Sequence, residues 1–340
     1  MMKKILIVIL LFLYVFGFLW AKGEEQQEEK PLVIYTYDSF VSEWGPAPVL
    51  IPMFEEKYGI KVDIQSAGDA GQVLQKIFLE KDNPQADIVI GIDNNMLSDA
   101  IEKDVLESSG ITPENLISED LVLDSNSRLV PYDYGYFSII YDSSVIDDPP
   151  HSLEDLTDEK YKESLILMDP RTSSPGRGFL LWTIAVYGDG FADYWERLMP
   201  SVLTITDGWD SGYGLFTSGE APMVLSYTTS PAYHVEYEDT DRYKTVIFPE
   251  GHYMQIEGMG IIKGSSNAEK ARLFIEFMLS REAQEIIPLT NWMYPVIKDA
   301  ELPDSFSAAP SADVNLMIDS NEINANLERW FEIWLEKASD

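Results

Sequence analysis

The 340-residue chain contains no cysteine, only three histidines and few basic residues for its length. The absence of cysteine excludes disulfides, thiolate metal sites, cysteine nucleophiles and lipid attachment to an N-terminal cysteine. The chain has 24 lysines and arginines against 58 aspartates and glutamates, which gives a net charge of −34. We expect no nucleic-acid partner, because such a partner requires a basic surface. The excess of acid either keeps the protein soluble, as in a salty habitat, or creates a field that attracts cations.

A recognisable catalytic motif is also missing. His151, His234 and His252 show no metal-ligand spacing, and no G-x-S-x-G sequence occurs. The stretches GRGFL and GYGLF lack the rest of a nucleotide-binding loop. Carboxylates are so numerous that any chosen pair carries little weight. We therefore expect neither an enzyme nor a metal or cofactor site.

Strong hydrophobicity is concentrated at the N-terminus. Lys3 and Lys4 precede an apolar run from Ile5 to Trp20, which is typical of an export signal. We predict a signal peptide over residues 1–21 with cleavage after Ala21; without cleavage the segment would tether the protein to the membrane. Residues 22–30, KGEEQQEEK, lack apolar side chains and predict a flexible spacer.

The remaining chain is long enough for two packed cores and has the pattern of an α/β protein. Strands are predicted over 32–37, 60–67 and 86–92, and helices over 47–59 and 70–83. This alternation favours a parallel sheet with covering helices.

A second α/β region is predicted after Leu129. It begins with an aromatic-rich strand over 129–146 and continues with further helix and strand material. Residues 251–287 predict strands and then one long amphipathic helix. The last helix, within 321–337, has a helical repeat of apolar residues that we expect in the core: Ile323, Leu327, Trp330, Trp334 and Leu335.

Polar and aromatic residues follow the first three predicted strands. The segments are YTYDSFVSEW, SAGDAG and GIDNNML. The carboxyl ends of parallel strands share one edge of a sheet, where ligands bind. We therefore expect these side chains to approach one cleft, although a single aromatic residue is more often part of a core: Tyr37, Trp44, Asp69, Asp93 and Asn94. Asp38 and Phe40 are expected only to shape the turn.

A second candidate site is MDPRTSSPGRGFLLW. Ser174 can cap a helix and Pro175 suits its first turn, while Thr172 and Ser173 add hydroxyls. The segment is either an ordinary helix cap or an anion site at a helix N-terminus. A third group, in segments rich in turn residues, has aromatic side chains that either pack or stack on a ligand: Trp209, Tyr227, Tyr233 and Trp292.

These motifs together resemble a known family. YTYDSFVSEWGPAP, DIVIGIDNN, PYDYGYFSIIYD, DPRTSSPGRGFLLW, SYTTSPAYH, EGHYMQ and NWMYPV are similar to segments of the thiamine-binding periplasmic proteins of thiamine ABC importers. The resemblance runs from about Leu32 to the C-terminal helix. Ala70 departs from the family pattern, which often has glycine beside the preceding acid.

The resemblance implies a two-lobed α/β fold of the type II periplasmic binding proteins. Lobe 1 would comprise 31–130 and 251–290, and lobe 2 would comprise 131–250 and 291–340, each a mainly parallel sheet with flanking helices and the cleft between them. It implies capture of thiamine, thiamine monophosphate and thiamine diphosphate in the periplasm for an ABC permease. The implied ligand site consists of Tyr37, Trp44, Asp69, Ser173, Trp209, Tyr227, Tyr233 and Trp292.

The chemistry of thiamine agrees with this set of residues. Aromatic faces suit its flat aminopyrimidine and its cationic thiazolium. A carboxylate at Asp69 can accept the amino hydrogens or offset the cationic charge, and the hydroxyls near Ser173 can receive the phosphate tail. Two alternatives stay open: a carrier of the same fold for ferric iron or another small solute, and a secreted hydrolase. A carrier returns its ligand unchanged, whereas a hydrolase does not.

Overall fold

The computed structural model describes residues 30–312 and 314–338. The predicted signal peptide and all of the predicted spacer except Lys30 lie outside these described residues. Every element below belongs to one unit, Leu32–Asp340. None of its described helices is both long enough and apolar enough to pass through a lipid bilayer.

Three parallel strands form the first group, in the order β2–β1–β3. They are β1 (Leu32–Thr36), β2 (Val62–Ser66) and β3 (Ile88–Asp93). The helices of this region are α2 (Asp38–Val41), α3 (Ala47–Tyr58), α4 (Ala70–Leu79) and α5 (Leu97–Glu102). The strands and helices predicted here are present, and Gly59 ends α3 with a left-handed φ of 69°.

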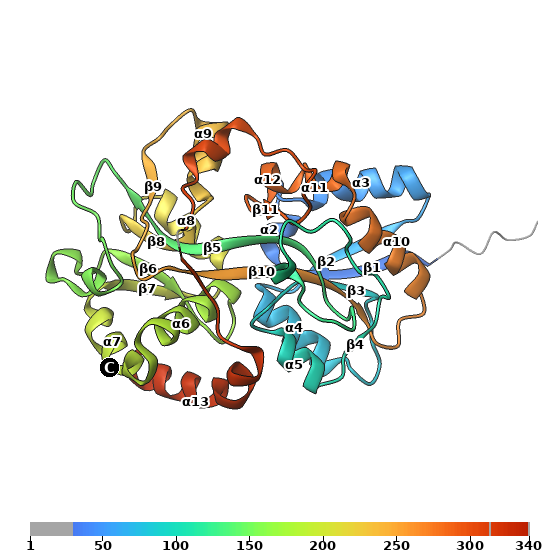
Figure 1. Ribbon diagram of the computed structural model, residues 1–340, viewed down its shortest axis with the longest axis horizontal. Coiled ribbons are helices and arrows are strands. Elements are labelled where there is room, and N and C mark those ends of the chain that lie inside the picture. The colour runs from blue at the N-terminus through green and yellow to red at the C-terminus, as the bar shows by residue number, and fades with distance from the viewer. Residues whose placement is uncertain (1–29, 313, 339–340) are drawn as a thin grey trace, which may run out of the picture. The chain divides into compact units, whose positions relative to one another are not determined.

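Two long antiparallel strands, β5 (Val130–Asp142) and β10 (His252–Ile262), run through the middle of the unit (Figure 1). β10 pairs with β3 and β5, and the second half of β5 pairs with β8 (Met223–Tyr227). Short strands attached to them are β4 (Leu106–Glu107), β9 (Tyr243–Thr245), β11 (Tyr294–Pro295) and β12 (Asn315–Leu316). The first half of β5 pairs with β10 and its second half pairs with β8, so β5 joins the first group of strands to the second.

The second group is also parallel, in the order β8–β6–β7. Its other strands are β6 (Leu165–Met168) and β7 (Val202–Thr206). The helices are α6 (Ser174–Tyr187), α7 (Phe191–Leu198), α8 (Trp209–Thr217) and α9 (Ser230–Glu238). Single 3₁₀ turns connect elements at Glu119–Leu121, Glu154–Thr157, Glu159–Tyr161, Gly188–Gly190, Met199–Ser201 and Asp304–Ala308.

The segment after β10 differs from the prediction of one long helix. It contains α10 (Ala268–Met278), α11 (Arg281–Gln284) and α12 (Ile287–Thr290). The break has a local cause, because the Ser280 hydroxyl accepts a hydrogen bond from Ala283 N at 3.4 Å and starts a new helix. The predicted strands before it are one continuous strand, β10.

The C-terminal helix α13 (Ser320–Ala338) lies beside α7 and α5 (Figure 1). It places Ile323, Leu327, Trp330 and Trp334 in the core of the second group, as predicted. Leu335 is an exception to the prediction, since it is 41% exposed. One residue further along a helix turns a side chain by about 100°, so Leu335 cannot share the face of Trp334. The lobe boundaries derived from the resemblance stay a prediction.

Candidate ligand-binding site

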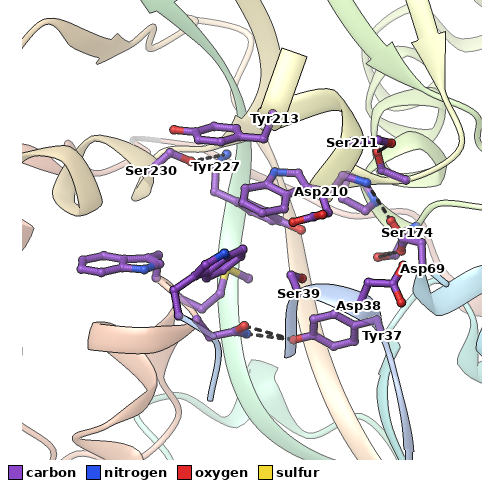
Figure 2. A pocket seen from close by; sticks show the side chains of 18 of the residues that line it. Tyr37, Asp38, Ser39, Asp69, Ser174, Asp210, Ser211, Tyr213, Tyr227 and Ser230 are labelled. Carbon is purple, nitrogen blue, oxygen red and sulfur yellow. Dashed lines mark hydrogen bonds between the residues drawn. The ribbon is translucent and has the colours of Figure 1, made fainter. Parts of the chain in front are cut away.

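A cavity of about 400 Å³ lies beyond the carboxyl ends of β1 and β2 and of β7 and β8. This is the edge at which open α/β sheets bind ligands. Figure 2 shows part of its lining, with Tyr37, Asp69 and Ser174 drawn near one another. Its aromatic residues are Tyr37, Trp44, Trp209, Tyr213, Tyr227, Tyr233 and Trp292.

The cavity brings together seven of the eight residues that were singled out as ligand contacts. They are Tyr37, Trp44, Asp69, Trp209, Tyr227, Tyr233 and Trp292. The eighth, Ser173, is fully buried and does not line the cavity, whereas its neighbour Ser174 does. The Ser173 hydroxyl caps α6 by accepting a hydrogen bond from Gly176 N at 3.3 Å. The binding role of each residue stays a prediction.

Two other residues expected at the cleft, Asp93 and Asn94, do not line it. Both side chains bond to β10 instead. Asp93 accepts a hydrogen bond from Gln255 Nε2 at 2.8 Å, and Asn94 accepts one from Ile256 N at 2.9 Å. β10, the antiparallel neighbour of β3, therefore supplies hydrogen-bond donors to two side chains that a purely parallel sheet would leave free at its edge.

Tyr37 directly follows β1, and its ring packs closely on β3. A Cβ atom at Gly91, which has a φ of 97°, would lie only 2.2 Å from that ring. The Tyr37 hydroxyl lies 2.7 Å from the Tyr132 hydroxyl and donates to Glu257 Oε2 at 3.2 Å. Burial raises the pKa of Tyr37 well above its ordinary value, so the hydroxyl keeps its proton.

Asp69 follows β2 and connects elements of both strand groups. As the N-cap of α4, its carboxylate accepts from Ala70 N at 2.6 Å. It also accepts from Trp209 N at 3.0 Å and from Ser174 N at 3.3 Å, which begin α8 and α6. The loss of water around the carboxyl raises the pKa of Asp69, and the three backbone donors act in the opposite direction.

Trp209 begins helix α8, although its segment is rich in turn residues. Its indole stacks on Tyr213 with ring centres 4.8 Å apart, and its Nε1 donates to Ser226 Oγ at 2.9 Å. The Trp44 ring meets Trp209 edge-on at 6.0 Å and is 38% exposed. Helix α8 is difficult to predict from the sequence, because it contains glycine and serine, which have poor helix propensity.

Tyr213 was not predicted as a site residue. Its hydroxyl lies 2.8 Å from Nε2 of the buried His234, whose Nδ1 lies 2.7 Å from Glu238 Oε2. Burial lowers the pKa of His234, which favours the neutral ring. A neutral ring that donates from Nδ1 to the carboxylate accepts a hydrogen bond from the Tyr213 hydroxyl at Nε2. Tyr213 and Trp209 are four residues apart, a helical spacing that could have identified the pair.

Tyr233 and Trp292 form another wall, with ring centres 5.4 Å apart in an edge-on arrangement. Tyr233 lies in α9 rather than in the expected loop, whereas Trp292 lies in the turn before β11. Trp292 has a φ of 57°, which is uncommon for a bulky residue and requires support from its surroundings. Tyr237 at 5.6 Å and Phe306 at 6.4 Å provide that support.

Tyr227 ends β8 and also lines the cavity. Its hydroxyl donates to Gln255 Oε1 at 2.7 Å, and its backbone N–H donates to Ser230 Oγ, the dashed contact near Tyr227 in Figure 2. Hydrogen bonds therefore hold both the backbone of Tyr227 and the hydroxyl end of its side chain beside the cavity.

Comparisons with known proteins agree with this geometry. A family model described as bacterial extracellular solute-binding protein matches residues 83–326. The thiamine-binding periplasmic protein of Brucella abortus is 43% identical over 314 residues, which are 92% of this chain and 93% of that protein. The corresponding protein of Escherichia coli is 38% identical over 308 residues, with 91% and 93% covered. The chain belongs to the bacterial extracellular solute-binding proteins.

Solved structures support the same family. A periplasmic thiamin binding protein superposes with a TM-score of 0.88 at 37% identity, covering 94% of this chain and 99% of that chain. A ferric binding protein from Campylobacter jejuni has a TM-score of 0.75 at 23% identity, which shows the fold alone. The type II periplasmic binding protein fold and the resemblance to thiamine-binding periplasmic proteins are both confirmed.

The cavity of this solute-binding protein is strongly acidic. Its described lining includes six carboxylic acids and neither lysine nor arginine: Asp38, Asp69, Asp207, Asp210, Glu238 and Glu257. Burial raises the pKa of Glu257 above its ordinary value. Aromatic walls and carboxyl groups together suit a flat organic cation better than an anion.

Proposed function

We propose that this protein is the extracytoplasmic receptor of an ABC importer, and that it binds thiamine in the aromatic cavity. The observation that carries the proposal is the composition of that cavity. Seven aromatic residues and six carboxylic acids line about 400 Å³ in a chain 43% identical to a thiamine-binding periplasmic protein. Thiamine offers two flat rings and one permanent positive charge, which this lining can match.

The rings of thiamine have candidate partners on both sides of the cavity. Tyr233 and Trp292 present one pair of faces, while Trp209 and Trp44 present another. A cation over an aromatic face gains about 0.5–2 kcal/mol, depending on its desolvation. We propose that these contacts hold the rings and that Tyr227, fixed through Gln255, completes the wall.

The phosphate esters form the finer part of the proposal. The first N–H groups of α6 and α8 are natural donors to an anion. Asp69 accepts from both of them, through Ser174 N and Trp209 N. A phosphate at this end would meet the same donors and the Asp69 carboxylate as well. Thiamine monophosphate and diphosphate are therefore proposed ligands whose affinity must be measured apart from that of thiamine.

Delivery to a permease and residence in the periplasm complete the proposal. They rest on the names of the relatives and on the expected export signal, which lies outside the described residues. The matched relatives are binding proteins, and we propose that this chain likewise acts without a cofactor and does not alter its ligand. The ferric-iron alternative is less favoured, because the hydroxyls of Tyr37 and Tyr227 already bond to Tyr132 and Gln255.

Calorimetric titration tests the proposal. The protein is first unfolded to remove any bound ligand and is then refolded. The titrants are thiamine, its two phosphate esters and ferric ion, with tryptophan fluorescence followed in parallel. We expect thiamine to bind tightly and to quench the emission of Trp44, Trp209 and Trp292. Chromatography of the recovered ligand should show it unchanged. Flat titrations with all three thiamine compounds would contradict the proposal, and conversion of the ligand would indicate an enzyme.

A further inference from the structure

Three carboxyl groups lie in a row beneath the cavity. Glu257 on β10 is the antiparallel partner of Asp133 on β5 and, on its other side, of Asp93 on β3. Asp93 and Asp133 are fully buried, and Glu257 is 5% exposed. Residues opposite each other on neighbouring strands have close side chains, and like charges in such positions repel. The fold therefore brings three acids together across the middle of the sheet.

Glu257 is the member of this row that lines the cavity. Its Oε2 accepts hydrogen bonds from Tyr132 Oη at 3.1 Å, Tyr37 Oη at 3.2 Å and Asn291 Nδ2 at 3.3 Å. These donors favour a negative charge on Glu257, but all of them are neutral groups. Across the described residues, no lysine, arginine or histidine forms an ion pair with Glu257 or Asp133.

Asp133 lies behind Glu257 and has fewer donors. Its Oδ2 accepts from Asn291 Nδ2 at 2.6 Å, while its Oδ1 is buried without a hydrogen-bond partner. The carboxyls of Asp133 and Glu257 can bond to each other only if one of them holds a proton. Two adjacent buried carboxyls cannot both ionise at low cost. The pair therefore keeps one proton on Asp133, the carboxyl with fewer donors, and only a second proton, on Glu257, can be displaced by a positive charge.

Asp69 cannot take this role in the same way. Its carboxylate already accepts from Ala70 N, Trp209 N and Ser174 N, whose helix N-termini supply partial positive charge. Glu257 receives no such backbone donors. Of these two cavity acids, Glu257 is the one without positive compensation.

Building on the proposed function, we infer that Glu257, backed by Asp133, selects the cationic ring of the ligand and gives up a proton when that cation binds. The proton passes from the Glu257 carboxyl to solvent, and the carboxylate left behind balances the positive charge of the ligand. No covalent bond of the ligand changes. A neutral molecule of the same shape would lack this compensation and would release no proton.

The protonation of the pair gives the inference a pH window. Burial raises the pKa of Glu257 to about 7, and burial together with the charge of Glu257 raises the pKa of Asp133 well above its ordinary value. A bound cation favours ionised Glu257, so its affinity should rise with pH up to about 7 and then level off. The groups that face the pair are Tyr37 at the end of β1, Asp93 on β3, Tyr132 on β5, Tyr227 on β8 and Asn291 before β11.

The test compares thiamine with an isostere in which an uncharged thiophene ring replaces the thiazolium. Both compounds carry the aminopyrimidine, so the titration of that ring cancels in the comparison. Calorimetry between pH 6 and 8, in two buffers of different ionisation enthalpy, counts the protons released by the refolded protein. We expect close to one proton per thiamine at pH 6, almost none at pH 8, and none with the isostere. Thiamine affinity should fall up to about tenfold from pH 7 to pH 6.

Glu257→Gln should lose affinity for thiamine by about 10–100-fold at pH 8 and remove the proton release. Its affinity for the isostere should stay within about threefold. Glu56→Gln, which removes an exposed carboxylate on α3, is the control for net charge and should behave as the unmodified protein.

The outcomes separate the two proposals. If neither compound binds, the proposed function fails. If thiamine binds the unmodified protein with no proton release between pH 6 and 8, or binds no better than the isostere, the role of Glu257 is wrong while thiamine binding stands. Both measurements on the unmodified protein decide the question even if Glu257→Gln does not fold.

Discussion

Asp69 and Glu257 both line the cavity but have different surroundings. Asp69 stands at the start of a helix and accepts from three backbone N–H groups. Glu257 lies in the interior of β10, where the sheet uses the backbone donors, and accepts only from side chains. The local backbone thus determines how each acid is compensated: helix starts offer free amides, whereas strand interiors offer none.

This difference separates two tasks that one carboxylate could not perform well. The amides bonded to Asp69 belong to α4 in the first strand group and to α6 and α8 in the second, so the acid links the two groups. Glu257 keeps an uncompensated charge or a proton at the cavity. Asp69 is therefore expected to act on the structure of the cavity, and Glu257 on the charge of the ligand.

The largest expected effect comes from removing the link, as in Asp69→Ala. The substitution deletes the cap of α4 and leaves the amides of Ser174 and Trp209 without an acceptor. We expect the free energy of unfolding in urea to fall by about 3–4 kcal/mol. Thiamine affinity should fall by about 100-fold, because the starts of α4, α6 and α8 lose the acceptor that holds them together at the cavity. Asp69→Asn keeps an oxygen acceptor and should lose about half as much; equal stability of all three proteins would contradict the role of the link.

The second prediction concerns the pH dependence of stability and uses Glu257→Gln without ligand. The folded-state pKa of about 7 lies above the ordinary 4.5, so the folded state binds more protons between these values. Stability due to Glu257 is therefore present below pH 4.5 and lost as pH rises to about 7. The unfolding free energy of Glu257→Gln, relative to that of the unmodified protein, should rise by up to about 3 kcal/mol between pH 4.5 and pH 7.

Urea unfolding at half-unit pH steps measures that difference. Asp69→Asn is the variant for comparison. The three backbone donors of the Asp69 carboxyl oppose the effect of burial on its pKa, so the difference in unfolding free energy between Asp69→Asn and the unmodified protein should change less with pH. Parallel stability curves for the unmodified protein and Glu257→Gln would show that folding does not raise the pKa of Glu257 and would remove the basis for proton release.

The sequence predicted one of these two acids and missed the other. Asp69 follows a strand and precedes a helix, so short-range periodicity locates it at the ligand edge of the sheet. The carboxyl row depends on the register of β3, β5 and β10, which are far apart in the chain. Single-sequence periodicity carries no information about such register, and Asp93 was accordingly expected at the cleft rather than beneath it.

The same distinction explains the aromatic residues. Tyr37 and Trp44 follow a clear strand, and both line the cavity as expected. Tyr213 is not apparent from the sequence because the segment around Trp209 is rich in glycine, which disfavours a helix, although the segment forms α8. Tertiary contacts, here the stack on Trp209 and the His234 hydrogen bond, stabilise a helix that propensity alone does not favour.

The third prediction separates ring stacking from charge. Tyr233→Ala removes an aromatic face that lines the cavity and contacts neither Asp69 nor Glu257 in the hydrogen-bond network. We expect thiamine and both phosphate esters to lose about 1–2 kcal/mol of binding free energy alike, with proton release unchanged. Tyr237→Ala controls for displacement of Trp292, because Tyr237 packs on the same Trp292 ring but is 61% exposed and does not line the cavity; a larger loss in Tyr233→Ala is then due to the missing Tyr233 face. A loss confined to the esters would show that Tyr233 contacts the tail.

The smallest expected effect distinguishes two adjacent serines at the Asp69 end of the cavity. The Ser174 hydroxyl lies 3.5 Å from Asp69 Oδ1 and lines the cavity, so it can also donate to a phosphate. Ser174→Ala should weaken binding by less than about 1 kcal/mol, in the increasing order thiamine, monophosphate, diphosphate, because hydrogen bonds to charged oxygens are the stronger ones.

Ser173→Ala is the control for this pair. Its buried hydroxyl caps α6 through Gly176 N, so its loss should lower the free energy of unfolding by about 1 kcal/mol and affect all three ligands equally. Dissociation constants for both variants, measured at one salt concentration, decide between the two positions. If Ser173→Ala discriminates by phosphate number and Ser174→Ala does not, the sequence-based choice of Ser173 is right, and α6 must shift in the complex to expose a hydroxyl that is buried here.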